Sequence, residues 1–356
     1  MDEVEIGRHP LVQSVARLAD QLLAPHAAQV DAGQVPRSHL AALAAAGVFA
    51  MAAPAPDGSR AVPAPVARRV QELLAGADAS TWFVQVQHHY PVRALAAVEG
   101  FEATLADLVA GRQVAGIAFS HLRGWPQRPV RATALPAGGW RFDGTAPWYS
   151  GWGLNDVALL AAATADGRVV FGLLPAVQAP GLQPSAPLRL AALQATRTVT
   201  LRLDGLVVPP AAVVTVAPVQ SWLAEDARVS VNANPACFGI ARRALDLLAE
   251  QGRRPAQQAA ATAAQRLRRS LQSVRAECYA LVDEVDPDAE TDRRLDLRAR
   301  AHQVMIEATT ALVVAGAGRA MSADAPAQRL AREALFMLIQ AQTVAARTAA
   351  LNRWGR

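Results

Sequence analysis

One stretch of the sequence concentrates residues that can bind a flat ligand. Residues 142–153 read FDGTAPWYSGWG and hold Trp148, Tyr149, Ser150 and Trp152, although aromatic residues make up only 5% of the chain. Indole and phenol rings can stack on a planar partner, and the Ser150 hydroxyl can hydrogen-bond to it. The same residues also suit a core strand that ends in a glycine turn, because Trp and Tyr favour pleated, half-buried surfaces. The composition of the stretch alone leaves these two interpretations balanced.

Other reactive side chains are few. His88 and His89 are adjacent in a helical segment, where their side chains point about 100° apart, so at most one of them faces a given pocket. Cys237 and Cys278 are the only cysteines. Both fall in helical pattern and are expected to be buried free thiols. The spacing of Cys and His fits no zinc site, and we predict no metal.

Three regions must position these residues. Helical patterns, such as the apolar stripe over 8–32, predict an N-terminal all-α domain in residues 1–112. In residues 113–218 the period changes to short β-type runs separated by turns, for example Pro136 to Gly139. We predict an antiparallel β-barrel domain there. Long Ala/Leu/Arg segments over 219–356 predict an up-and-down four-helix bundle. The expected bundle helices span 220–251, 256–285, 290–322 and 326–352.

The composition is that of a globular protein with a large core. The 356 residues allow two or three domains, with 52% apolar and 18% charged residues. No apolar run reaches the ~20 residues that span a bilayer. The acidic N-terminus lacks the apolar part of a secretory signal, so we expect a cytoplasmic protein that does not act on membranes. The net charge is +5. Every basic residue is Arg and is scattered among Asp and Glu, which favours solvated helix faces over nucleic-acid binding.

The order of the regions and several local motifs resemble the acyl-CoA dehydrogenase superfamily over essentially the whole chain. Residues 144–151 resemble a strand of that family whose Trp and hydroxyl residues contact the flavin of FAD, with Ala146 in place of the family's Lys. Residues 115–120 resemble the strand whose hydroxyl residue hydrogen-bonds the flavin pyrimidine ring. Residues 315–318 stand where the family has a Gly-Gly pair near the FAD of a neighbouring subunit. The resemblance implies cofactor contacts from Phe119, Ser120, Trp148, Tyr149, Ser150, Gly316 and Gly318.

The resemblance also implies a reaction, the oxidation of an acyl thioester between Cα and Cβ. The flavin accepts hydride from the β-carbon, and a carboxylate removes the α-proton. Residues 226–246 resemble the start of the bundle's first helix, where an Arg contacts the acyl-CoA. This implies Arg228 as a substrate-binding residue, and His89 is the other candidate for that role.

The catalytic base is where the sequence departs from the family. If residues 332–334 are aligned with the family's Arg-Asp-Ala segment, Ala341 takes the usual position of the base Glu. Some members carry the Glu just before the CoA-contacting Arg, where this chain has Ala227. Asp226 is the remaining candidate for the catalytic base, one residue and about 100° away along a helix. A solvated or capping Asp is the alternative interpretation.

Two further functions therefore stay open. A flavin-dependent monooxygenase of the same fold uses reduced flavin and O2, needs no such carboxylate, and could take FMN in place of FAD. A non-catalytic or partner subunit of a heteromeric acyl-CoA dehydrogenase would also lack the base. The family's Arg-x-x-Phe-Gly contact to the FAD pyrophosphate is missing as well, although Arg253 or Arg254 can still meet a phosphate.

The resemblance implies the partners too. The substrate would be an acyl-CoA or another acyl thioester, and the electrons would pass to an acceptor or come from a flavin reductase. In the family the FAD site is completed across a subunit interface. We therefore expect a homodimer or homotetramer, with a heteromer as the alternative.

Overall fold

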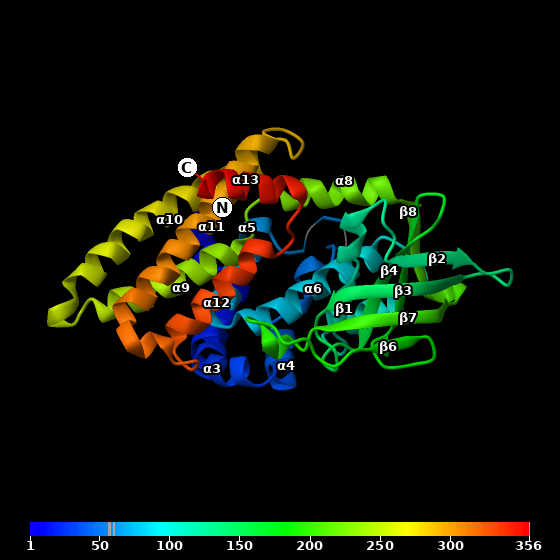
Figure 1. Cartoon of the computed structure of the whole chain (residues 1–356), viewed down its shortest axis with the longest axis horizontal. Helices are drawn as coiled ribbons and strands as arrows, with labels where there is room; N and C mark the ends of the chain where they lie inside the picture. Colours follow the sequence, from blue (N-terminus) through cyan, green and yellow to red (C-terminus); the bar gives the residue numbers. More distant parts are fainter. Residues whose placement is uncertain (56–57, 60, 356) are drawn as a thin grey trace.

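The chain is helical at both ends and forms a sheet in the middle, in a computed structural model that describes residues 1–55, 58, 59 and 61–355 (Figure 1). The π-helical turn η1 (Ala19–Leu23) joins α2 to α3, so the helix predicted over 8–32 is distorted in its middle. The N-terminal helices are α1 (Glu3–Arg8), α2 (Pro10–Leu18), α3 (Ala24–Ala32), α4 (Arg37–Ala45), α5 (Ala64–Ala77), α6 (Ala79–Ala96) and α7 (Glu102–Val109).

Helix α6 lies between the sheet and the C-terminal helices (Figure 1). It begins where the buried Asp78 side chain accepts hydrogen bonds from the backbone N–H groups of Ser80 and Thr81, at 3.0 and 3.3 Å. Such a cap satisfies donors that the first helical turn leaves free. Because α6 contacts both α5 and β1, residues on its different faces reach different domains.

The middle domain is one mixed sheet with the strand order β6-β7-β3-β2-β4-β5-β8, and β1 pairs with β4. The predicted β domain is confirmed, but β1–β4 and β2–β4 are parallel pairs where the sequence led us to expect antiparallel pairing throughout. Long connections separate these strands, and only long connections allow parallel pairing. The strands are β1 (Ala115–Ala118), β2 (Val130–Ala134), β3 (Trp140–Tyr149), β4 (Val157–Ala163), β5 (Arg168–Pro175), β6 (Leu182–Pro184), β7 (Val199–Val208) and β8 (Val213–Pro218).

Four long helices form the C-terminal bundle, as predicted, but its first and last segments are each divided in two. The first segment divides where Asn234 caps a new helix with Pro235 in its first turn. The last one divides at residues 340–343. The helices are α8 (Val219–Ser230), α9 (Pro235–Gln251), α10 (Gln258–Glu284), α11 (Thr291–Gly316), α12 (Pro326–Ile339) and α13 (Val344–Trp354), with α9 to α12 as the bundle.

Helix α5 crosses α9 at very short range. A Cβ added at Gly239 would lie 2.0 Å from the Glu72 carbonyl oxygen, and one added at Gly76 would lie 2.6 Å from the Gly239 carbonyl oxygen. The fully buried Glu72 carboxylate accepts hydrogen bonds from Arg242 at 3.2 Å and from Arg275 at 2.6 Å, which ties α5 to α9 and α10. The glycines and this ion-pair cluster join the N-terminal helices to the bundle.

Helix α11 is the central helix of the bundle. By length and composition alone, the segment Thr291–Met321 could cross a membrane, with a mean hydropathy of 1.3 over its most apolar window. It contacts α9, α10 and α12, and it carries buried Arg294, Arg298 and His302. Of its most apolar window 39% is buried, and that part packs against the other bundle helices.

Candidate functional site

Trp148 stands out from the sheet because of a bulge in β3. Between Ala146 and Tyr149, β3 advances three residues while its partner β7 advances two, from Leu201 to Val199. The extra residue is absorbed at Trp148, whose φ is 63° and whose exposed fraction is 58%. A bulge of this kind redirects a side chain that regular alternation would place elsewhere. The Trp148 indole is therefore free to stack on a flat partner.

Tyr149 and Ser150 face the interior beneath this bulge. The Tyr149 hydroxyl accepts a hydrogen bond from Asn155 Nδ2 at 3.1 Å, and burial raises the pKa of the Tyr149 phenol. The Ser150 hydroxyl is buried and lies 2.6 Å from the Thr198 hydroxyl. The sequence predicted that both side chains contact the cofactor. Both side chains are buried, so the predicted contact stays a prediction for Tyr149 and Ser150, and it would have to be made from beneath the exposed surface of the sheet.

Phe119 and Ser120 follow β1 and lie beside helix α6. The Phe119 ring packs 4.7 Å from Tyr90 of α6 and 5.6 Å from Trp222 of α8, measured between ring centroids, and it is almost fully buried. Ser120 begins the short helix η3 (Ser120–Gly124) and is half-buried. Of this predicted pair, Ser120 is the residue that a ligand could reach, because Phe119 belongs to an aromatic cluster.

Asp226 is held in an ion pair. Its two carboxylate oxygens accept hydrogen bonds from Nε and Nη2 of Arg123, each at 2.7 Å. This bidentate pair joins η3 to α8 and leaves Asp226 no uncommitted oxygen for proton abstraction. The geometry weighs against its predicted role as a base. Arg228, one turn away from Glu225 and paired with it, is 41% exposed in its side chain and is accessible to an anionic ligand.

A buried arginine binds the backbone of the segment in which the family's base would lie. Ala341 has a φ of 49° in the segment between α12 and α13. Arg298 of α11 donates hydrogen bonds to the carbonyl oxygens of Gln340 at 2.9 Å and Ala341 at 3.4 Å, and also to that of Ser230. Burial lowers the pKa of Arg298. The segment is thus fixed from behind by a guanidinium group and carries no carboxylate.

His89 lies on the face of α6 that turns towards α5. It is 7% exposed, and its Nε2 lies 3.5 Å from Nε2 of Gln71. Burial lowers the pKa of His89 to about 3, with His88 and Arg93 as further causes, so the ring is neutral at physiological pH. His89 is therefore in reach only of a ligand that enters between helices.

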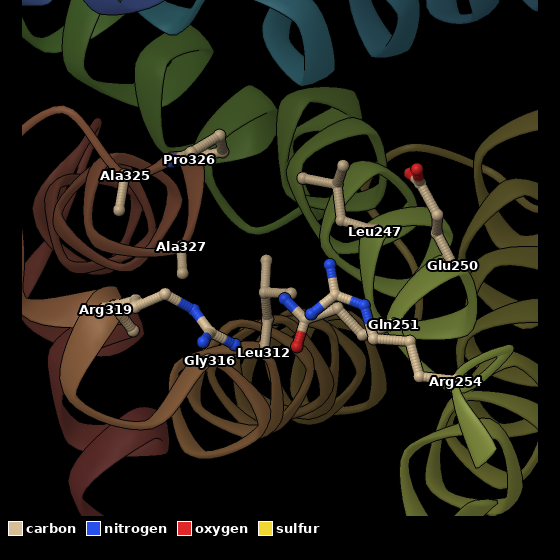
Figure 2. Close-up of a pocket in the computed structure, with 11 residues that line it drawn as sticks. Leu247, Glu250, Gln251, Arg254, Leu312, Gly316, Arg319, Ala325, Pro326 and Ala327 are labelled. Carbon is tan, nitrogen blue, oxygen red and sulfur yellow. The ribbon is translucent and has the colours of Figure 1, made fainter. Parts of the chain in front are cut away.

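Polar side chains line a pocket of about 300 Å³ at the end of the bundle. Gly316, a predicted cofactor contact, lines it together with Arg254, Arg319 and Gln251. Figure 2 shows the side chains of Arg254 and Arg319 reaching towards the Gln251 amide from opposite sides. Two guanidinium groups around one concave space suit a phosphate.

Two glycines near this pocket differ in role. A Cβ at Gly316 would lie 2.8 Å from Ala320 Cβ, so glycine lets the chain fold back from α11. Gly318, also a predicted cofactor contact, has open space around it and does not appear in the pocket lining.

The Gln251 Oε1 atom is buried and has no hydrogen-bond partner among the described residues. An orphaned acceptor at the pocket suggests that a ligand or water completes it.

A second groove, of about 400 Å³, lies on the outward face of β2, β3 and β7. It is lined by charged residues that pair with one another, such as Arg141 with Asp143 and Arg202 with Asp204. These side chains are largely exposed, so the groove has the character of a solvated strand surface. Within the described residues, no group of three or more His, Cys, Asp or Glu could hold a metal ion.

Sequence reasoning missed three arginines of these sites. Arg319 follows the Gly-containing run directly, and Arg123 lies three residues after Ser120, so proximity to a motif was a usable signal for both. Arg298 stands one turn after Arg294 and one turn before His302, and all three side chains are buried in α11. A charged pair spaced four residues apart in a core helix indicates a buried polar role.

Comparison with known proteins identifies the N-terminal domain. Residues 8–111 match the family model described as acyl-CoA dehydrogenase, N-terminal domain. No curated protein sequence matches the chain.

Solved structures share the fold over the full length. Butyryl-CoA dehydrogenase from Megasphaera elsdenii has a TM-score of 0.83 at 16% identity, with 100% of each chain covered. Glutaryl-CoA dehydrogenase from Mycobacterium smegmatis in complex with FADH2 has a TM-score of 0.80 at 17% identity, covering 100% of this chain and 96% of that one. Dibenzothiophene monooxygenase from Paenibacillus sp. A11-2, with FMN and indole, has a TM-score of 0.75 at 22% identity, with 97% of each chain covered. At these identities the likeness shows the fold.

Proposed function

We propose that this chain belongs to the acyl-CoA dehydrogenase superfamily and is a flavin-dependent oxidoreductase with FAD as its cofactor, because its N-terminal region matches that family's model and its fold matches solved members. The observation that carries the proposal is the exposed Trp148 indole, which a bulge turns outward from the sheet of a complete three-part fold. Relatives of the same fold were solved with FADH2 or FMN.

The residues fit a flavin dinucleotide in part. The Trp148 indole offers a planar surface for a ring, and half-buried Ser120 offers a hydroxyl. Arg254 and Arg319 offer charged donors for phosphates at the bundle pocket. Phe119, Tyr149 and Ser150 are buried and would support the surface on which the ring lies. Binding would thus depend on Trp148 and on the two arginines.

The leading reaction is the α,β-oxidation of an acyl thioester, in which the bound flavin would accept a hydride. Arg228, exposed on α8, would contact the anionic CoA moiety. The proton of the α-carbon must pass to a base, and in this chain Asp226 would have to leave Arg123 to serve. This requirement is the weakest step for a dehydrogenase formed by this chain alone.

A specific observation favours a second candidate, a monooxygenase that uses reduced flavin, FAD or FMN, and O2. No carboxylate stands at positions 227 or 341, and Arg298 holds the backbone at the latter. Oxygenation needs no such base, and one relative of this fold is a monooxygenase. The same observation supports a third candidate, a subunit that acts with a partner chain which supplies the carboxylate.

One experiment separates the dehydrogenase from the monooxygenase. Purified protein reconstituted with FAD is mixed anaerobically with a series of acyl-CoA thioesters, and flavin absorbance is followed. Bleaching supports the dehydrogenase. Oxygen consumption with a hydroxylated product after addition of reduced flavin supports the monooxygenase. Protein that binds no flavin under any condition would contradict both.

The variant Ala341→Glu sharpens the distinction. If the scaffold is a dehydrogenase that lacks only its base, a carboxylate at residue 341 should accelerate bleaching by orders of magnitude, because general-base catalysis contributes about 10²–10⁴-fold. Ala341→Gln is the matched control without a charge.

We propose a cytoplasmic location, which fractionation of cells would test.

A further inference from the structure

Helix α12 connects the pocket at the bundle end to the segment that follows the helix. Residues 325–327, at its N-terminus, line the pocket that contains Arg254 and Arg319. Its C-terminus leads into Gln340, whose carbonyl oxygen accepts a hydrogen bond from Arg298 at 2.9 Å. A movement of the N-terminal half of α12 would therefore change the shape of the pocket.

The C-terminal half of α12 is attached to the N-terminal helices by two contacts. Arg332 forms an ion pair with Asp31 of α3. The Phe336 ring lies 4.8 Å from the Phe83 ring of α6, measured between centroids. This half of the helix is therefore held on more than one side.

The N-terminal half of α12 has less to hold it. Residues 326–331 carry one charged side chain, Arg329, and the helix begins without a side-chain cap. Arg329 is buried and donates a hydrogen bond to Glu333 Oε1 at 2.6 Å. The position of this half thus depends on apolar packing and on the balance of charge around Arg329.

Two buried carboxyl groups share this one arginine. Asp78, at the start of α6, is 1% exposed, Glu333 is 3% exposed and Arg329 is 5% exposed. Arg329 interacts electrostatically with both carboxyl groups. If both are ionised, the cluster holds one negative charge without a counter-charge and away from water, which is costly. One proton on the pair restores the balance.

The hydrogen bonds indicate which carboxyl group takes the proton. Asp78 accepts from the backbone N–H groups of Ser80 and Thr81 and from the Thr81 hydroxyl at 2.6 Å. These bonds oppose the effect of burial, which raises the pKa of Asp78. Glu333 Oε2 is buried and has no partner among the described residues, so it can be protonated without losing a hydrogen bond. Burial raises the pKa of Glu333 to about 7, Arg329 opposes this, and Asp78 adds to it.

Among the described residues, Arg329 is the only ion-pair partner of Glu333. Asp31 of α3 adds a smaller like-charge effect and is itself paired with Arg332. Burial lowers the pKa of His302 in α11 to about 3, so that ring is neutral. The charged residues of α9 have other surroundings: Arg242 pairs with Glu72, Asp246 pairs with Arg268, Arg243 stands beside Gly76, and Glu250 lines the pocket.

We infer that a proton on Glu333 keeps the N-terminal half of α12 packed against the bundle and thereby keeps the pocket at the bundle end formed. When the proton is lost, the excess negative charge weakens the packing of residues 326–333, and residues 325–327 move away from the pocket. The C-terminal half stays in place, because Arg332 and Phe336 hold it. By linkage, a ligand that binds the formed pocket also favours uptake of the proton.

The test is hydrogen exchange of the flavin-free protein at pH 6 and pH 8.5, measured by mass spectrometry on peptides and corrected for the intrinsic exchange rates. Peptides that cover residues 326–333 should lose protection as pH rises. One proton limits this loss to about tenfold per pH unit. Peptides of α10 report on the bundle as a whole and should keep their protection.

Two variants test the cluster from both sides. Glu333→Gln cannot lose the proton, so α12 should stay protected at both pH values. Asp78→Asn keeps a residue that caps a helix about as well as Asp, and it leaves Arg329 to Glu333 alone. It should therefore remove the pH dependence as well, and it serves if Glu333→Gln does not fold. Glu307→Gln, at an exposed carboxyl group of α11, is the matched control and should behave like the wild type.

Equal protection of α12 at both pH values in the wild type would overturn the inference. A pH dependence that Glu333→Gln and Asp78→Asn both retain would do the same. Parallel loss of protection in α10 and α12 would show that the whole bundle loosens, which also contradicts a local role for Glu333.

A second measurement rests on the proposed flavin site. FAD should bind the wild type more weakly at pH 8.5 than at pH 6, whereas its affinity for Glu333→Gln should change little between the two. An equal pH dependence in both proteins would separate the pocket from Glu333 and overturn that part of the inference. If FAD binds at neither pH, the proposed function fails, and hydrogen exchange still decides the role of Glu333.

Discussion

One extra residue in β3 leaves the side chain of Trp148 exposed and the side chains of its neighbours buried. Trp148 takes up the bulge and is exposed, whereas Tyr149 and Ser150 anchor the strand from below through Asn155 and Thr198. Trp148 thus offers an exposed ring, while the neighbouring Tyr149 and Ser150 stabilise the strand. Substitutions at the exposed and the buried residues should have different effects.

Trp148→Ala should weaken flavin binding without destabilising the fold. The exposed indole contributes little to the core, so the free energy of unfolding should change by less than about 0.5 kcal/mol. Loss of ring stacking should raise the flavin Kd about three- to tenfold. Fluorescence titration and chemical denaturation measure the two quantities. Trp354→Ala, which removes a similarly exposed indole from α13, is the control and should leave the Kd unchanged.

Glu333 is a buried carboxyl group with one free oxygen. Its Oε1 accepts from Arg329 at 2.6 Å, and its Oε2 has no hydrogen-bond partner among the described residues. Burial raises the pKa of Glu333 to about 7; Arg329 opposes this shift, and Asp78 and Asp31 add to it. The folded protein therefore holds this proton more tightly than the unfolded chain does.

Stability should accordingly fall as pH rises through this range. The contribution of protonated Glu333 is fully present below the ordinary pKa of 4.5 and is lost by the time pH passes the folded value of about 7. Glu333→Gln should abolish this part of the pH dependence, which is on the order of 2–3 kcal/mol. Urea denaturation between pH 5 and 8 checks it, with the exposed Glu99→Gln as control. Parallel curves for wild type and Glu333→Gln would contradict the assignment.

At the scale of elements, the crossing of α5 and α9 depends on glycine. Gly239→Ala would place a methyl group 2.0 Å from the Glu72 carbonyl oxygen, so the helices would have to separate. We expect a loss of more than about 2 kcal/mol of folding stability, because backbone cannot yield as a flexible side chain does. Gly7→Ala in α1, with nothing within 4 Å of the new Cβ, should be neutral or slightly stabilising. Thermal denaturation compares the two.

The sequence predicted well the elements that have a long apolar period. Where the prediction failed, the cause was a feature that hydrophobic periodicity does not register. The predicted helix over 220–251 is divided because Asn234 and Pro235 start a new helix, a signal that periodicity alone does not register. The pairing of β1 with β4 depends on contacts far apart in the chain, which a period-2 pattern cannot reveal. The exposure of Trp148 and the burial of Ser150 both follow from a bulge, which breaks the alternation on which sequence reasoning relies.

The motifs named some of the residues that line the pocket at the bundle end. Gly316 and Arg254 are 62 positions apart in the sequence and line the same space. Arg319 and Gln251 became visible only when α9 and α11 were placed side by side. The catalytic base remains unidentified. The Asp226 carboxylate is paired with Arg123, and the segment that contains Ala341 is held by Arg298 through backbone carbonyl oxygens.

At the scale of the whole molecule, the exposed indole and the arginine pocket are far apart. Trp148 belongs to β3 of the sheet, whereas Arg254 and Arg319 follow α9 and α11, whose C-terminal ends lie on the side of the bundle away from the sheet (Figure 1). If both hold one dinucleotide, the two halves must come from different copies of the chain. This arrangement predicts that two variants, each defective in one half of the site, restore flavin binding when they form a mixed dimer.

Trp148→Ala and Arg254→Ala chains, each poor in flavin, should regain tight binding when they are mixed as unfolded chains and refolded together. A mixed dimer contains one site with both defects and one site with neither. We expect about one tightly bound flavin per two chains in that dimer, measured by absorbance after gel filtration. Mixtures that retain no more flavin than either variant alone would show that one copy suffices.

The position of the arginine pocket has a consequence for handling the protein. When two halves of a site sit on separate chains, occupancy obeys mass action for the chains as well as for the flavin. If the site is shared in this way, dilution that separates the copies should also release the flavin, and the yellow colour should fade faster than a simple binding isotherm predicts. Concentrating the sample with the released flavin still present should bring the colour back.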